Sequence, residues 1–148
     1  MKVAILMGSP RDDEKMAGAV EMLTRFGVEH EVHVMSAHRT PEEVAEFASN
    51  ARSNGFGVII CGAGMAAHLA GVVSAHTTIP VIGVPLSGGI SGGMDALLST
   101  VQMPRGIPGA TVAVDGSANA GVLAVEILSL SNGDLVVQLQ RFRDEGAR

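Results

Sequence analysis

The sequence predicts an α/β fold in which a doubly wound parallel sheet carries helices on both faces, as a single domain over residues 1–148. Short apolar runs of strand length alternate with segments whose apolar residues recur at helical spacing. The links between them are short, as in βαβ units, which build parallel sheets covered on both sides. No internal repeat, linker or shift in composition marks a second domain.

The first strand and helix are predicted within residues 2–23. The apolar run Lys2–Met7 ends at Gly8 and indicates a buried strand. From Asp12 onward the apolar residues fall on one helical face, namely Met16, Ala19, Val20 and Leu23. Acidic residues at positions 12–14 suit the first turn, where the helix dipole favours negative charge.

A second strand, Glu29–Val34, leads to a strong helix start. Thr40 is expected as N-cap and Pro41 as the first helical residue, with Glu43 completing a capping box. The apolar face of this helix is predicted to comprise Val44, Phe47, Ala48 and Ala51.

The rest of the chain continues the alternation. Three more strands are expected, at Gly57–Ile60, at Ile79–Val84 between Pro80 and Pro85, and at Gly109–Val114. Further helices are predicted near Met94–Gln102 and, from about residue 119 onward, at Asn119–Leu130 and Leu135–Phe142, with Gly133 and Asp134 separating the last two. Five strands favour the three-layer, flavodoxin-like order, in which ligands bind beyond the carboxyl ends of the strands.

Composition excludes several functions. A net charge of −5 argues against a nucleic-acid-binding face. Four Phe, with no Trp or Tyr, leave little to stack on single strands or on a flavin. The lone Cys61 permits no internal disulfide, so we expect a buried thiol in a cytoplasmic protein. The first apolar run is too short for a signal peptide, and no run is long enough to span a membrane, so no membrane partner is expected.

Three loops at the predicted carboxyl edge carry the candidate chemistry. The first contains GSPRD at residues 8–12, where backbone N–H groups at a helix start can bind an anion. It matches neither the Walker A pattern nor G-x-G-x-x-G. An ordinary turn remains the alternative, with Asp12 as a first-turn acid and Arg11 as a solvated charge.

The second loop contains SAHRT at residues 36–40. Ser36 can donate to an anion, and the planar guanidinium of Arg39 suits phosphate or carboxylate. His38 can transfer a proton near neutral pH. The alternative is a histidine that packs at the turn and bonds to the backbone.

The third loop contains GAGMAAHLAG at residues 62–71. Its small residues let the backbone approach a ligand, and His68 adds one imidazole, although His68 could also simply start a helix. His30 and His33 lie three apart on a strand and so face opposite ways, which makes a poor metal pair. We expect no metal site.

Six motifs together resemble one family. They occur in the order found in the N5-carboxyaminoimidazole ribonucleotide mutases, the PurE family of purine biosynthesis, from about Val3 to Leu130: GSPRD, SAHRTP, GAGMAAHLAG, PVIGVP, MDALLSTVQMPRGIP and NAGVLAVEIL. The second and fifth are the most specific. The AAHL pattern favours the mutase branch over the branch that carboxylates aminoimidazole ribonucleotide with free CO2.

The resemblance implies a flavodoxin-like subunit of a homo-octamer that binds a small ribonucleotide and uses no cofactor. His38 would transfer the proton. The substrate-binding residues would be Ser9, Ser36 and Arg39 around the phosphate, Asp12 at the ribose, and Gly64, Ala66, Ala67, His68 and Leu69 around the migrating carboxylate. Ala37 would also contact the substrate. The apolar C-terminal stripe Leu135, Leu139 and Phe142 also favours an oligomer, because a lone tail would expose it.

Three residues depart from the family pattern. Arg11 stands where a second serine usually helps to bind the phosphate, Met65 replaces a common glycine, and Ala70 replaces a common proline. Arg11 either substitutes by charge as a substrate-binding residue or points away.

The implied reaction moves CO2 from N5 to carbon 4 of the aminoimidazole ring, and His38 could both supply and remove the proton. The alternatives are the direct carboxylase, a non-catalytic nucleotide-binding relative and a flavin-binding protein.

Overall fold

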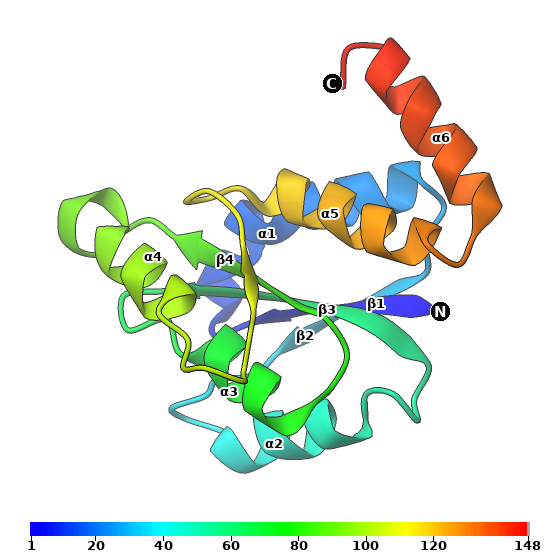
Figure 1. The fold of residues 1–148 in the computed structure, drawn as a ribbon. Helices are drawn as coiled ribbons and strands as arrows, with labels where there is room; N and C mark the ends of the chain where they lie inside the picture. The colour runs from blue at the N-terminus through cyan, green and yellow to red at the C-terminus, as the bar shows by residue number, and fades with distance from the viewer. Residues whose placement is uncertain (148) are drawn as a thin grey trace.

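The structure, a computed structural model, describes residues 1–147 as a three-layer α/β arrangement (Figure 1). Within these residues one five-stranded sheet has the order β2-β1-β3-β4-β5, and every pairing is parallel. The strands are β1 Lys2–Met7, β2 His30–Val34, β3 Phe56–Gly64, β4 Val81–Leu86 and β5 Ala110–Thr111. The predicted doubly wound sheet and its flavodoxin-like order are confirmed.

Helices cover both faces of this sheet. On one face lie α1 (Asp13–Arg25) and α5 (Ser117–Ser129), which pack against each other, and α6 (Gly133–Asp144) extends from α5 (Figure 1). On the other lie α2 (Pro41–Asn50) and α3 (Leu69–His76), while α4 (Met94–Val101) packs against β4 and β5. Short 3-10 turns, η1 (Pro10–Asp12) and η2 (Ile90–Gly92), precede α1 and α4. No helix in the described part of the chain is long and apolar enough to cross a membrane.

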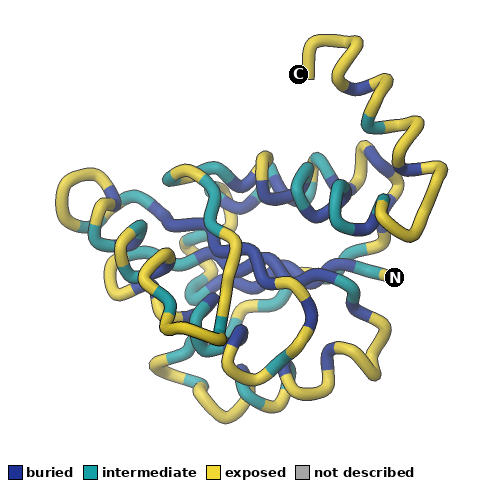
Figure 2. The backbone as a smooth tube through the Cα atoms, in the orientation of Figure 1, coloured by how far each residue is buried: buried dark blue, intermediate teal, exposed yellow. Residues whose placement is uncertain are grey.

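The core forms because strand side chains alternate between the two faces. In β1, Val3, Ile5 and Met7 pack toward α1 and α5, whereas Ala4 and Leu6 pack toward α2 and α3. The tube of Figure 2 is correspondingly dark along the central strands. Every residue predicted on the apolar faces of α1 and α2 packs into these clusters, with Val20 and Phe47 only partly buried.

Cys61 is a buried residue of β3, as predicted. Burial raises the pKa of its thiol well above the ordinary value, because the thiolate would be poorly solvated there. The cysteine therefore fills space and is chemically inert.

Two strands extend beyond their predicted ends. β3 continues to Gly64. Glycine suits position 62 within it because a Cβ there would lie 2.3 Å from the sulfur of Met16, which would have to move. β4 contains Pro85, which was expected to end it. The Pro85 carbonyl accepts a bond from Asp115 N–H at 2.9 Å on the side where the β5 ladder has already ended, so the ring displaces no ladder bond.

Other predicted boundaries are also corrected. β5 retains only two of the six residues expected. The capping box at Thr40 is wrong: in the described chain the hydroxyl of Thr40 bonds back to Ser36 and caps no N–H group of α2. Gly133 and Asp134 lie inside α6, because the side chain of Asn132 caps that helix by accepting from Asp134 N–H at 3.1 Å.

The C-terminal stripe is covered within the chain. Leu135 and Phe142 are buried, and Leu139 packs against the same core cluster. The ring of Phe142 meets Phe26 edge to face, with centroids 5.3 Å apart. The prediction that this stripe favours an oligomer is therefore wrong, because the chain itself covers it.

Candidate functional site

The three predicted loops meet at the carboxyl ends of β1, β2 and β3, and the loop after β4 joins them. Together they enclose a cavity of about 430 Å³. Its lining includes the predicted residues Ser9, Arg11, Asp12, Ser36, Ala37, His38, Arg39, Gly64, Ala66, His68 and Leu69. The central expectation from the sequence, that these loops converge on one site, is confirmed.

The second loop is a closed turn that presents two side chains to the cavity. The Ser36 hydroxyl oxygen accepts from the N–H groups of His38 and Arg39, both at 3.3 Å. Ser36 N–H donates to the Thr40 hydroxyl at 3.0 Å, and Thr40 N–H donates to the Ser36 carbonyl at 2.8 Å. These bonds satisfy the turn internally, and the side chains of His38 and Arg39 line the cavity.

Two histidines touch at the cavity. His38 Nε2 lies 2.7 Å from His68 Nδ1, and their rings are nearly perpendicular, at 89°. One nitrogen must carry the proton and the other must accept it, so the pair shares a proton when both rings are neutral. Both side chains are exposed on the open side of the loops. The sequence identified each histidine, but thirty residues separate them and nothing in the spacing predicts their contact.

The first loop forms η1. The Ser9 hydroxyl accepts from Arg11 N–H at 3.3 Å, and Asp12 N–H donates to the Ser9 carbonyl at 3.0 Å. Burial raises the pKa of the Asp12 carboxyl above its ordinary value, although the charges of Lys15 and Arg39 and a bond from the Ser9 backbone oppose the rise. Arg11 is exposed at the rim of the cavity.

The third loop contains a strained residue. Met65 has φ +55°, a left-handed conformation that costs a side-chain-bearing residue about 1–2 kcal/mol. This explains why glycine suits the position, which the sequence marked as a departure from the family pattern. Ala67 is buried and lies outside the cavity lining, so its place among the substrate-binding residues stays a prediction.

Sequence reasoning missed the fourth loop. Ser87 and Gly88 line the cavity, and Lys15 of α1 bonds to Ser87. The available signal was the glycine-rich segment SGGISGG, which follows a buried strand and so had to emerge at the same edge of a parallel sheet.

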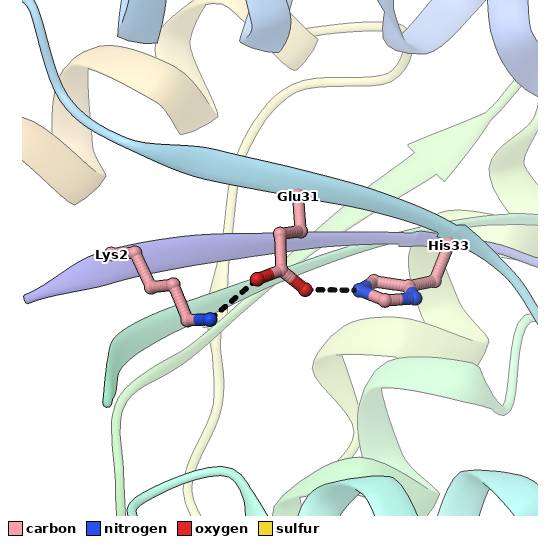
Figure 3. Close-up of polar contacts among 3 residues, drawn as sticks. All are labelled: Lys2, Glu31 and His33. Carbon is pink, nitrogen blue, oxygen red and sulfur yellow. Dashed lines mark hydrogen bonds and ion pairs between the residues drawn. The ribbon is translucent and has the colours of Figure 1, made fainter. Parts of the chain in front are cut away.

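The two histidines of β2, His30 and His33, do not line the cavity. His30 Nδ1 lies 2.9 Å from the Val28 carbonyl, and His33 bonds to Glu31 on the sheet edge (Figure 3). Within residues 1–147 no group of three or more His, Cys, Asp or Glu side chains is placed to hold a metal ion.

Residues 2–148 match the family model described as AIR carboxylase. The chain belongs to the AIR carboxylase family. It is 57% identical to an N5-carboxyaminoimidazole ribonucleotide mutase of Aquifex aeolicus, over 86% of this chain and 77% of that protein. It is 49% identical to the mutase of Saccharolobus solfataricus, over 97% and 91%. The family resemblance inferred from six motifs is therefore confirmed.

Two further members extend the comparison. A phosphoribosylaminoimidazole carboxylase of Candida glabrata is 51% identical over 95% of this chain, which spans 25% of that longer protein. The crystal structure of Treponema denticola PurE superposes with a TM-score of 0.89 at 29% identity, covering 98% of this chain and 90% of that one. Relatives named as a mutase and a relative named as a carboxylase are thus similar to this chain to about the same degree.

Proposed function

We propose that this protein is an N5-carboxyaminoimidazole ribonucleotide mutase of purine biosynthesis, which moves CO2 from N5 to carbon 4 of the same imidazole ring. Relatives of that name are about half identical over most of the chain. The main structural support is the His38–His68 contact of 2.7 Å, because it joins the second loop to the loop of small residues at one cavity.

Substrate binding falls to the first two loops. Ser36 and Arg39, with Ser9 and the first-loop N–H groups, hold the phosphate, and Arg39 can do so with two parallel bonds. Arg11 reaches the phosphate from the rim, and the Asp12 carboxylate accepts from the ribose hydroxyls. All of these residues line one cavity, which supports this assignment.

The reaction needs one group that first donates a proton and later accepts one. His38 donates it to N5, the N5–carboxyl bond breaks, and CO2 is released beside the free amine. Carbon 4 then attacks CO2 and forms the new carbon–carbon bond, and His38 removes the proton from carbon 4. Gly64, Ala66, His68 and Leu69 surround the carboxylate, and the small residues among them leave room to hold CO2 between the two steps. Ala37 lines the same cavity.

His68 has a second part in this proposal. Its Nδ1 faces His38 Nε2, so it can accept the proton of that nitrogen and hold the ring in position, or pass a proton to it.

A homo-octamer and a cytoplasmic location belong to the same proposal. An apolar face of α4 supports assembly: Met94, Leu98 and Val101 are each about half exposed, and Ile90 before them is 73% exposed. Sedimentation at micromolar concentration tests the assembly, and a monomer would contradict it.

The deciding experiment is turnover of N5-carboxyaminoimidazole ribonucleotide without added bicarbonate and with EDTA present. Formation of the carbon-4 carboxylated product supports the mutase. Product formation only from aminoimidazole ribonucleotide and bicarbonate would indicate the direct carboxylase, the name that the Candida glabrata relative carries. Stabilisation by the nucleotide without any turnover would indicate a non-catalytic relative.

A further inference from the structure

The cavity wall formed by the loop after β4 is clamped from two sides. Lys15 Nζ donates to the Ser87 carbonyl at 2.6 Å and to the Ser87 hydroxyl at 2.9 Å. Ser87 N–H donates to Asp115 Oδ1 at 2.9 Å. Ser87 lines the cavity, whereas Lys15 and Asp115 do not. Lys15 and Asp115, which lie outside the cavity lining, therefore hold the N–H, the carbonyl and the hydroxyl group of Ser87.

The Asp115 side of this clamp is itself firmly held. Asp115 has a left-handed φ of +57°, and its N–H donates to the Pro85 carbonyl at 2.9 Å. Burial tends to raise the pKa of its carboxyl, but bonds from Ser87 and the charge of Lys15 lower the pKa below its ordinary value overall. Ser87 thus lies between an ammonium group and an ionised carboxylate.

Lys15 also acts electrostatically on Asp12 of the first loop. Lys15 follows Asp12 by three residues, a spacing that brings side chains at the start of a helix to one side. The charges of Lys15 and Arg39 oppose the rise in the pKa of the half-buried Asp12. Without Lys15, the largest of the effects that oppose burial would be lost, so the pKa of Asp12 would rise further.

We infer that Lys15 is a positioning residue of the substrate cavity, which fixes the Ser87–Gly88 wall and supplies a cation beside the ribose-binding Asp12. Gly88 fits this wall because its φ is +113°, a conformation that residues with a side chain rarely adopt. The roles of the cavity and of Asp12 rest on the proposed function. Lys15 itself bonds to the wall and lies outside the cavity lining.

The test is Lys15→Met, with Lys15→Gln as a second variant of similar length. We expect the KM to rise about tenfold, because a charge-assisted contact to the wall is lost, while kcat stays within about threefold. The acid limb of the kcat/KM profile should move to higher pH, since Asp12 must be ionised to accept from the ribose. A merely structural role would not move that limb.

Lys2→Met is the matched control. It removes another partly buried lysine, which pairs with Glu31 on β2, away from the cavity lining. It should leave the KM and the acid limb unchanged.

An active parent whose Lys15 variants keep the parental KM and acid limb would overturn the inference. A parent without turnover would count against the proposed function instead. In that case calorimetry with the carbon-4 carboxylated product still tests Lys15, because the Kd should rise about tenfold in the variants if the clamp shapes the cavity, and an unchanged Kd would overturn it.

Discussion

His33 and His38 lie five residues apart, yet their surroundings differ completely. His33 projects from β2 and donates from Nε2 to Glu31 Oε2 at 3.1 Å, while its ring lies against Phe47 with centroids 4.8 Å apart. Glu31 also pairs with Lys2, so one carboxylate serves two partners (Figure 3). His38 projects from the loop beyond β2, and its ring meets the cavity and a second imidazole.

The difference between the two histidines lies in the partners of each imidazole. The partners of His33 are a carboxylate and an aromatic ring that the chain itself supplies, so the imidazole completes a local network. The polar partner of His38 is another titratable base, and the space beside both is open. Under the proposed function a proton on the His38–His68 pair passes to the substrate, whereas His33 faces a carboxylate of its own chain.

We expect the largest difference in kcat between the two positions when each histidine is replaced by asparagine. His38→Asn should lower kcat at least ~10²-fold, the lower end for a general acid–base group, because the amide cannot exchange a proton near neutral pH. Nucleotide affinity should change little, since the phosphate contacts remain. His33→Asn should keep kcat within a few-fold. Steady-state kinetics and calorimetry measure both.

An active His38→Asn enzyme would remove the distinction. If its kcat stays within a few-fold of the parent, His38 is not the proton carrier, and His68 becomes the candidate to test next.

Arg39 follows His38 in the same turn and tests whether this turn also binds the phosphate. Arg39→Ala removes a charge-assisted phosphate contact, so we expect the KM to rise by about 10–100-fold with a much smaller change in kcat. Initial rates over a range of substrate concentration separate the two constants. A loss confined to kcat would place Arg39 with the chemistry and not with anchoring.

Arg11 tests the same anchoring function from the rim. Arg11→Glu should raise the KM about tenfold by placing a negative charge beside the phosphate, and Arg11→Ser should remain active because it restores the family pattern. Phosphate-dependent affinity, measured by calorimetry, provides an independent readout. An unchanged KM in Arg11→Glu would show that this side chain faces solvent.

The smallest expected effect lies on the His33 side. A bond from Lys2 lowers the pKa of Glu31 below its ordinary value of 4.5, desolvation opposes this, and His33 adds to the lowering. Because the folded pKa is the lower one, Glu31 contributes stability that is full above about pH 5.5 and is lost as the pH falls through the folded pKa. Glu31→Gln should therefore melt slightly below the parent at pH 7, with the gap closing toward pH 3. Thermal melts across this range measure it, and a gap that does not vary with pH would contradict the assignment.

Local patterns in the sequence determined most of the architecture. The alternation of apolar runs and helical faces predicted the parallel sheet, because burial on both faces requires continuous apolar strands such as Lys2–Met7. The same topology predicted that residues 8–12, 36–40 and 62–71 meet at one edge, since parallel strands end together. Element ends were less accurate at Gly62, Pro85 and Thr40, because a neighbouring strand or loop decided each of them.

Only the tertiary structure decided which side chains touch. His38 and His68, or Lys15 and Ser87, come from elements that are distant in sequence, and their separation depends on strand register and helix placement to within an ångström. The apolar stripe of α6 shows the same limit: Leu135 and Phe142 have an amphipathic pattern whether a second subunit or the chain's own Phe26 covers them. Periodicity specifies that a face must be buried, and the packing of the whole chain determines what buries it.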